Sequence, residues 1–136
     1  IGAVIATGKA MDLLVPGDHG STFGGNPISC AAANVVLDVI SQNKMLRSNK
    51  LKGDLLKRLI SAIPGVVEVR GKGLLVGIEV EEQRAKEIAA DLLKRGFLVN
   101  SANESVIRIA PGYLITERNI ETFATTLRKV CRQIYG

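Results

Sequence analysis

The sequence predicts an α+β domain with a small sheet over residues 43–136, preceded by a strand, a loop and a helix over residues 1–42. Two observations support this prediction. From Val66 onward, short apolar strand patterns are arranged around one helical pattern and are closed by another. The preceding strand, loop and helix fit poorly into such a domain. We therefore interpret residues 1–42 as the end of a larger α/β domain with its connecting helix.

The first segment begins with an apolar run, Ile1–Ala6, that predicts a short buried strand. Thr7–Leu14 suits a short helix capped by its first residue. Val15–Pro27 is a loop rich in glycine and proline. A longer helix is expected to start at Asn26-Pro27, because Asn is a favoured N-cap and Pro is favoured at the first helical position.

A buried strand as the first element, without a lead-in and without an initiating Met, leads us to expect further residues upstream of Ile1. We therefore expect the chain to be a fragment of a longer protein.

The second segment carries apolar residues at helical spacing in three places and strand-like apolar runs between them. Breaks at Pro64-Gly65 and Gly96 separate these patterns. The expected elements are a helix over Ser48–Ala62, strands over Val66–Arg70 and Leu74–Val80, a helix over Glu81–Arg95, strands over Phe97–Asn100 and Val106–Ala110, and a last helix capped by Thr116.

Composition argues against nucleic-acid and membrane partners. Aromatic residues make up 4% of the chain, too few to suggest a platform for stacking bases. The net charge of +5 is spread along the chain and interleaved with acidic residues, which is typical of solvated helix faces. No apolar run has the length of a membrane span, and we expect neither a membrane anchor nor a signal peptide.

The two cysteines, Cys30 and Cys131, lie in apolar helical patterns without metal-ligand spacing. We expect reduced, buried thiols and a cytoplasmic protein without a metal site, although the sequence alone leaves a single disulfide open.

Gly20–Pro27 is a glycine-rich loop that opens a helix, and this arrangement is typical of an anion-binding site. Ser21 and Thr22 add hydroxyl donors that suit a phosphate group. The alternative is a tight loop whose glycines only permit turns and whose Asn26 caps the helix. His19, the only histidine, is more often a structural residue than a catalyst in such a setting.

Arg108 lies in the middle of the last predicted strand, Val106–Ala110. Side chains alternate between the faces of a strand, so Ile107 and Ile109 share one face and Arg108 takes the other. Arginine suits bidentate binding of a carboxylate, which makes Arg108 a candidate ligand for an acidic substrate. Snorkelling to solvent or pairing with an acidic side chain of the protein is an equally good interpretation.

Four segments together resemble the class III aminotransferases, which are fold-type I enzymes that use pyridoxal 5'-phosphate (PLP). They are IGAV at the start, GDHGSTFGGNP before an alanine-rich helix, VRGKGLLVGIEV, and GFLVN…VIRIAP…LITE. The last segment is most similar to acetylornithine aminotransferases, with ornithine and succinylornithine aminotransferases as close alternatives. The resemblance implies transfer of the δ-amino group of N2-acetylornithine to 2-oxoglutarate, a step of arginine biosynthesis. It also implies that residues 43–136 are the C-terminal small domain and residues 1–42 the end of the large PLP-binding domain.

The resemblance also assigns roles to three residues. Thr22 matches the threonine that binds the cofactor phosphate in the neighbouring subunit's active site, which implies a homodimer. Ser21 matches the adjacent position that contacts the substrate, and Arg108 matches the arginine that holds the α-carboxylate of glutamate or 2-oxoglutarate. The lysine that anchors the cofactor precedes the segment matching IGAV, so we expect no catalytic residue in this chain and no activity from the chain alone.

A different function remains open on the residues alone. The chain could be a stand-alone α+β domain that binds an anion or a nucleotide through the Ser21-Thr22 loop. This alternative predicts salt-sensitive binding to polyanions.

Overall fold

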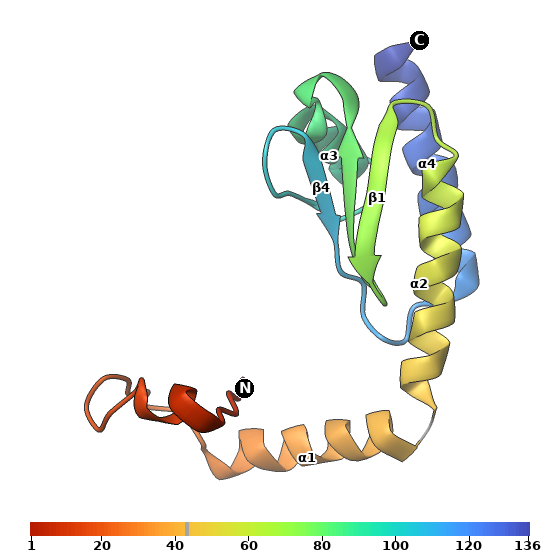
Figure 1. Cartoon of the computed structure of the whole chain (residues 1–136). Helices are drawn as coiled ribbons and strands as arrows, with labels where there is room; N and C mark the ends of the chain where they lie inside the picture. Colours follow the sequence, from red (N-terminus) through yellow and green to blue (C-terminus); the bar gives the residue numbers. More distant parts are fainter. Residues whose placement is uncertain (43) are drawn as a thin grey trace. The chain divides into compact units, whose positions relative to one another are not determined.

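The computed structural model describes residues 1–42 and 44–136, which form two compact units, Ile1–Asn43 and Lys44–Gly136. We call them the N-terminal unit and the C-terminal unit and describe each by itself. Figure 1 shows the elements of both.

The N-terminal unit contains a short 3-10 helix, η1 (Gly8–Asp12), and a long helix, α1 (Pro27–Gln42). The strand predicted over Ile1–Ala6 is absent, and these residues are exposed. A strand requires a neighbouring strand for its backbone hydrogen bonds, and the described residues of this unit supply none. Thr7 lies at the N-cap of η1 but makes no side-chain capping bond, so that part of the prediction was also wrong.

The start of α1 confirms the predicted cap. The Asn26 side-chain oxygen accepts a hydrogen bond of 3.0 Å from the backbone N–H of Ser29, and Pro27 is the first helical residue. None of the side chains described in residues 1–41 is buried. The N-terminal unit therefore has no core of its own.

The C-terminal unit is an antiparallel four-stranded sheet in the order β1-β2-β4-β3 with three α-helices. This architecture confirms the predicted α+β fold. Its elements are α2 (Met45–Ser61), β1 (Val66–Lys72), β2 (Leu75–Val80), η2 (Glu81–Gln83), α3 (Ala85–Lys94), β3 (Asn100–Ser101), β4 (Val106–Ile109) and α4 (Glu117–Tyr135).

Helix α2 begins three residues before its predicted start, and the bounds of β1, β2 and β4 differ from the prediction by one or two residues. Two further differences are larger. The predicted helix over Glu81–Arg95 is split into η2 and α3, because Glu82 and Gln83 have positive φ angles that interrupt the helix. The predicted strand over Phe97–Asn100 is reduced to Asn100–Ser101, since only these two residues pair with β4.

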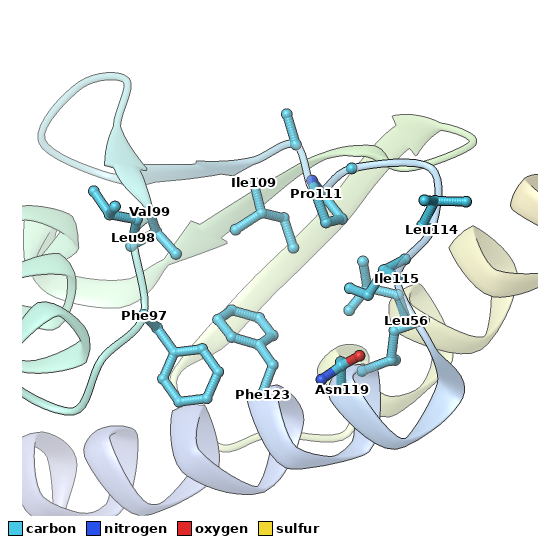
Figure 2. A pocket seen from close by; sticks show the side chains of 13 residues that line it. Leu56, Phe97, Leu98, Val99, Ile109, Pro111, Leu114, Ile115, Asn119 and Phe123 are labelled. Carbon is cyan, nitrogen blue, oxygen red and sulfur yellow. The ribbon is translucent and has the colours of Figure 1, made fainter. Parts of the chain in front are cut away.

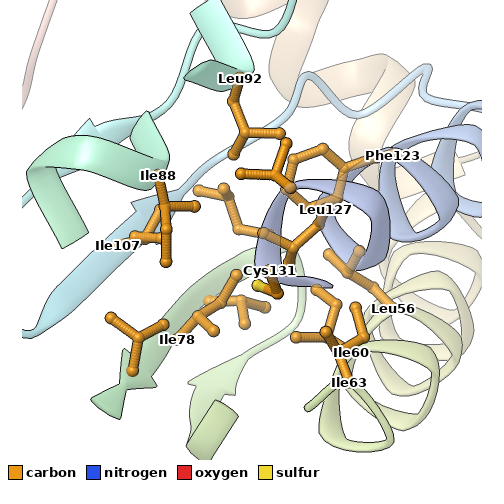
Figure 3. Packing of buried hydrophobic residues seen from close by; sticks show 14 of the residues in the cluster. Leu56, Ile60, Ile63, Ile78, Ile88, Leu92, Ile107, Phe123, Leu127 and Cys131 are labelled. Atoms are coloured by element: carbon orange, nitrogen blue, oxygen red, sulfur yellow. The ribbon is translucent and has the colours of Figure 1, made fainter. Parts of the chain in front are cut away.

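The core lies between one face of the sheet and the three helices (Figure 3). Alternate residues of β2 and β4 point into it, including Ile78 and Ile107, which are fully buried. Each such side chain stabilises the fold by about 1.5–3 kcal/mol. The buried stripe of α4 consists of Ile120, Phe123, Ala124, Leu127, Val130 and Cys131.

Helix α4 starts with a capping box at the predicted residue. The Thr116 hydroxyl accepts from the backbone N–H of Asn119 at 3.1 Å, and the Asn119 side chain accepts from the backbone N–H of Thr116 at 3.1 Å. The prediction that Thr116 caps the last helix is confirmed.

Helix α2 approaches the turn between β1 and β2 at a glycine. A Cβ atom added to Gly53 would lie 2.1 Å from the backbone oxygen of Gly73. Only glycine allows the helix and the turn to pack this closely.

Both cysteines are free thiols, as expected. Cys131 is buried, and desolvation raises the pKa of its thiol to about 11. Cys30 is only half-buried in the N-terminal unit, so the prediction of a buried thiol was wrong at that position.

Candidate functional site: an anion-binding loop and an exposed arginine

The Ser21-Thr22 loop forms a turn directly before α1. The backbone N–H of Gly24 donates to the oxygen of Ser21 at 3.2 Å, and the Asn26 side chain donates to the oxygen of Phe23 at 2.8 Å. A Cβ atom at Gly24 would lie 3.0 Å from the Cβ of Ser21, so the turn is tight enough to favour glycine. Asn26 is therefore used in holding the loop and capping the helix.

Ser21 and Thr22 remain available for a ligand. Both are exposed, and their hydroxyls make no hydrogen bond within the described residues of the N-terminal unit. An uncommitted hydroxyl beside a glycine-rich turn fits the oxygens of a phosphate group. Thr22 thus fits the expected contact with the phosphate of PLP, and Ser21 lies beside it with a free hydroxyl, as expected for a substrate contact.

His19 shows no catalytic arrangement. Its neighbour Asp18 closes the loop by accepting from the backbone N–H of Val15 at 2.9 Å, and His19 itself is exposed. Within residues 1–42 and 44–136, no group of three or more metal-ligating side chains is present.

Arg108 lies in the C-terminal unit on the face of β4 opposite the core. Ile107 and Ile109 are buried while Arg108 is exposed, which confirms the predicted alternation. Among the described residues of this unit, no carboxylate lies within ion-pair distance of Arg108. The alternative in which Arg108 pairs with an acidic side chain of its own domain is therefore not supported.

The sheet register reveals the neighbours of Arg108, which the sequence did not indicate. Gly77 of β2 and Asn100 of β3 are its direct partners on either side, and Arg70 of β1 lies beyond Gly77. We call the face that carries these four residues the outer face of the sheet. Arg70 is already bound by two carboxylates, Glu79 at 2.6 Å and Glu68 at 2.7 Å, and the hydrogen bonds that it donates to them raise the pKa of Arg70.

An apolar pocket of about 360 Å³ lies on the other side of the sheet, between the segment after β4 and α4 (Figure 2). Ile109 and Phe123 point into it, so Arg108 faces away from it. Its polar side chain, Asn119, is already used in the capping box of α4. The pocket therefore offers apolar surface and no free reactive group.

The family model for aminotransferase class-III matches residues 1–131 of the chain. The chain belongs to the class-III aminotransferases. This finding confirms the resemblance drawn from the four sequence segments.

Curated relatives of this class-III aminotransferase chain include two acetylornithine aminotransferases. The protein from Mycobacterium leprae is 46% identical over 129 residues, covering 93% of this chain and 32% of the relative. The protein from Mycobacterium bovis is 41% identical over 138 residues, covering 100% of this chain and 34% of the relative. The chain thus spans about a third of the length of the curated relatives it matches.

Solved structures agree with this assignment. The acetylornithine aminotransferase from Elizabethkingia anophelis is 33% identical with a TM-score of 0.73, covering 91% of this chain and 34% of that one. The ornithine aminotransferase from Toxoplasma gondii is 30% identical with a TM-score of 0.75, covering 94% of this class-III aminotransferase chain and 32% of that one.

Among the described residues, no helix combines the length and apolar character needed to cross a membrane.

Proposed function

We propose that this chain is the C-terminal part of an acetylornithine aminotransferase. The intact enzyme transfers the δ-amino group of N2-acetylornithine to 2-oxoglutarate with PLP as cofactor, as a step of arginine biosynthesis in the cytoplasm. The observation that carries the proposal is similarity of 41–46% identity to relatives of that name over 93–100% of the chain. Arg108, which is exposed and has no acidic partner among the described residues of its unit, supports it, because both partners of the second half-reaction are dicarboxylates.

Within this proposal each unit has a defined part. Residues 1–42 form the end of the large PLP-binding domain with its connecting helix, and residues 43–136 form the small domain. The enzyme is a homodimer in which Thr22 binds the cofactor phosphate across the subunit interface and Ser21 contacts the substrate. Its partners are small molecules, without nucleic acid or membrane.

Arg108 contributes binding and orientation. Its guanidinium group offers a planar pair of N–H donors, which match the two oxygens of an α-carboxylate and fix the direction of the attached carbon. Thr22 holds one end of the cofactor so that its reactive end stays in place. PLP, when bound, supplies the electron sink for amino transfer. No residue of this chain matches the lysine that anchors the cofactor, so the proton transfers belong to the remainder of the enzyme.

The proposal is tested with the purified full-length enzyme, by measuring glutamate formation from 2-oxoglutarate with three amino donors in parallel. We expect N2-acetylornithine to give a higher kcat/KM than N2-succinylornithine and ornithine. A preference for free ornithine would favour the second candidate, an ornithine aminotransferase, which the similarity to the Toxoplasma gondii structure supports.

Arg108→Ala tests the carboxylate assignment in the same assay. Loss of a bidentate charged interaction costs about 1.5–3 kcal/mol or more, so KM for 2-oxoglutarate is expected to rise at least about tenfold. An unchanged KM would contradict the role of Arg108.

A further inference from the structure

The outer face of the sheet places four residues in one row across all four strands. Arg70 pairs with Gly77, Gly77 with Arg108, and Arg108 with Asn100. Side chains that are directly opposite in antiparallel strands point to the same face, with Cβ atoms about 4.5–5.5 Å apart. Arg108 therefore has a residue without a side chain on one side and a primary amide on the other.

The fold does not explain the glycine in this row. A Cβ atom at Gly77 would lie 3.6 Å from Cγ1 of Val106 and 3.8 Å from Cγ of Arg70, which are ordinary contact distances. The backbone of Gly77 is not among the glycines with positive φ, so an L-residue could adopt it. Glycine weakens the interior of a strand. Its effect here is that no side chain stands between Arg70 and Arg108 in this row, where a Cβ atom would fit at ordinary contact distances.

The charges on the two sides of that space are unequal. Arg70 is bound by Glu68 and Glu79, two negative charges against its one positive charge, so it offers no free charge to an incoming anion. Arg108 has no acidic partner among the described residues of the C-terminal unit. An anion that enters the space above Gly77 is therefore attracted to Arg108.

Asn100 offers a second donor on the far side. It is exposed, and its side chain makes no hydrogen bond within the described residues of this unit. A carboxylate has about four acceptor positions, of which a guanidinium fork uses two. The amide N–H₂ of Asn100 can occupy another of these positions beside Arg108.

We infer that Gly77 and Asn100 are specificity-determining residues of the Arg108 carboxylate subsite. Gly77 leaves the space into which the carboxylate of 2-oxoglutarate or glutamate fits, and Asn100 donates a hydrogen bond to that carboxylate. This inference rests on the proposed function, in which Arg108 binds the α-carboxylate.

Gly77→Val in the full-length enzyme tests the open space. Valine suits a strand, so the melting temperature is expected to stay unchanged or to rise. The valine methyl groups fill the space beside Arg108, and KM for 2-oxoglutarate is expected to rise about tenfold or more. Gly77→Ala, whose Cβ meets only ordinary contacts, is expected to raise KM by a smaller factor. A higher KM accompanied by a lower melting temperature would indicate a structural role and would overturn this part of the inference.

Asn100→Asp tests the second donor, because a carboxylate opposite Arg108 competes with the substrate for the guanidinium group. KM for 2-oxoglutarate is expected to rise about tenfold or more, and the factor is expected to shrink as salt screens the new ion pair. The matched control is Asn103→Asp, which makes the same charge change in the loop between β3 and β4. This substitution retains a side-chain oxygen that can accept from the backbone N–H groups of Ser105 and Val106, as the Asn103 oxygen does, so KM is expected to stay unchanged.

Arg108→Ala distinguishes a failure of the proposed function of Arg108 from a failure of the inference about Gly77 and Asn100. If Arg108→Ala leaves KM for 2-oxoglutarate unchanged, the proposed function of Arg108 is wrong. If Arg108→Ala raises KM but Gly77→Val and Asn100→Asp both match the wild type, the proposed function stands and the present inference is overturned.

Discussion

Gly53→Ala is expected to destabilise the protein, although alanine is the better helix former. In the interior of α2 the change would by itself stabilise the helix by about 1 kcal/mol. The new Cβ, however, would lie 2.1 Å from the backbone oxygen of Gly73 and 2.6 Å from its carbonyl carbon. A normal contact requires a separation of about 3.2 Å or more, so α2 and the β1–β2 turn must move apart by about 1 Å.

The cost of that displacement is expected at the upper end of the range for overpacking, about 3 kcal/mol, because the Gly73 atoms belong to the backbone and cannot rotate away. The net destabilisation is then about 2 kcal/mol. For a domain of this size it lowers the melting temperature by roughly 10 °C.

Thermal unfolding followed by far-ultraviolet circular dichroism measures this effect. Ser48→Ala is the control, since Ser48 is exposed on the same helix and its replacement is expected to leave the melting temperature unchanged or slightly higher. A melting temperature of Gly53→Ala at or above that of Ser48→Ala would refute the close approach of α2 to the turn.

Three further predictions concern single side chains. Burial raises the pKa of Cys131 to about 11, so this thiol is expected to resist alkylation by iodoacetamide at pH 8 until the protein is unfolded, whereas the half-buried Cys30 is expected to react first. Mass spectrometry of the labelled peptides measures both reaction rates. Equal rates would contradict the burial of Cys131. Hydrogen bonds from Lys57 and Lys50 lower the pKa of Asp54. This pairing therefore stabilises the fold at pH values above the usual carboxyl pKa, and the stabilisation is lost as the pH falls through the lowered pKa. In acid denaturation experiments, the free energy of unfolding of Asp54→Asn is therefore expected to fall slightly less steeply with decreasing pH than that of the wild type. A steeper fall would contradict the ion pairs. Thr22→Ala in the full-length enzyme is expected to weaken PLP retention about tenfold, measured by cofactor absorbance after dialysis, and full retention would contradict the phosphate contact.

Apolar periodicity and the breaks at Pro64-Gly65 and Gly96 predicted most elements of the C-terminal unit. Side-chain caps marked one helix start in each unit, whereas α2 and α3 begin without a side-chain cap. Asn26 and Thr116 cap their helices as expected. The strand predicted over Ile1–Ala6 failed, since a strand depends on a neighbour that the described residues of its unit do not contain.

The candidate site was predictable only in part. The alternation of β4 gave the direction of Arg108 from the sequence alone. Gly77 becomes its neighbour through the pairing of β2 with β4, which α3 separates in the sequence, and no local pattern fixes such long-range pairing. Asn100 becomes its neighbour through the register of the β3–β4 hairpin, which the sequence analysis did not predict. The roles of Thr22 and Arg108 as ligands are tested by the substitutions above, and the role of Ser21 stays a prediction.

The lack of a core in the N-terminal unit has a thermodynamic consequence for the proposed homodimer. None of the side chains described in residues 1–41 is buried, and α1 exposes Val35, Val36 and Leu37. In the proposed homodimer, the unit whose side chains become buried is therefore the same unit that carries Thr22. Cofactor binding and subunit association are then linked, and each strengthens the other by the same free energy. In the proposed homodimer, diluting the enzyme is therefore expected to release PLP, and adding PLP is expected to hold the two subunits together.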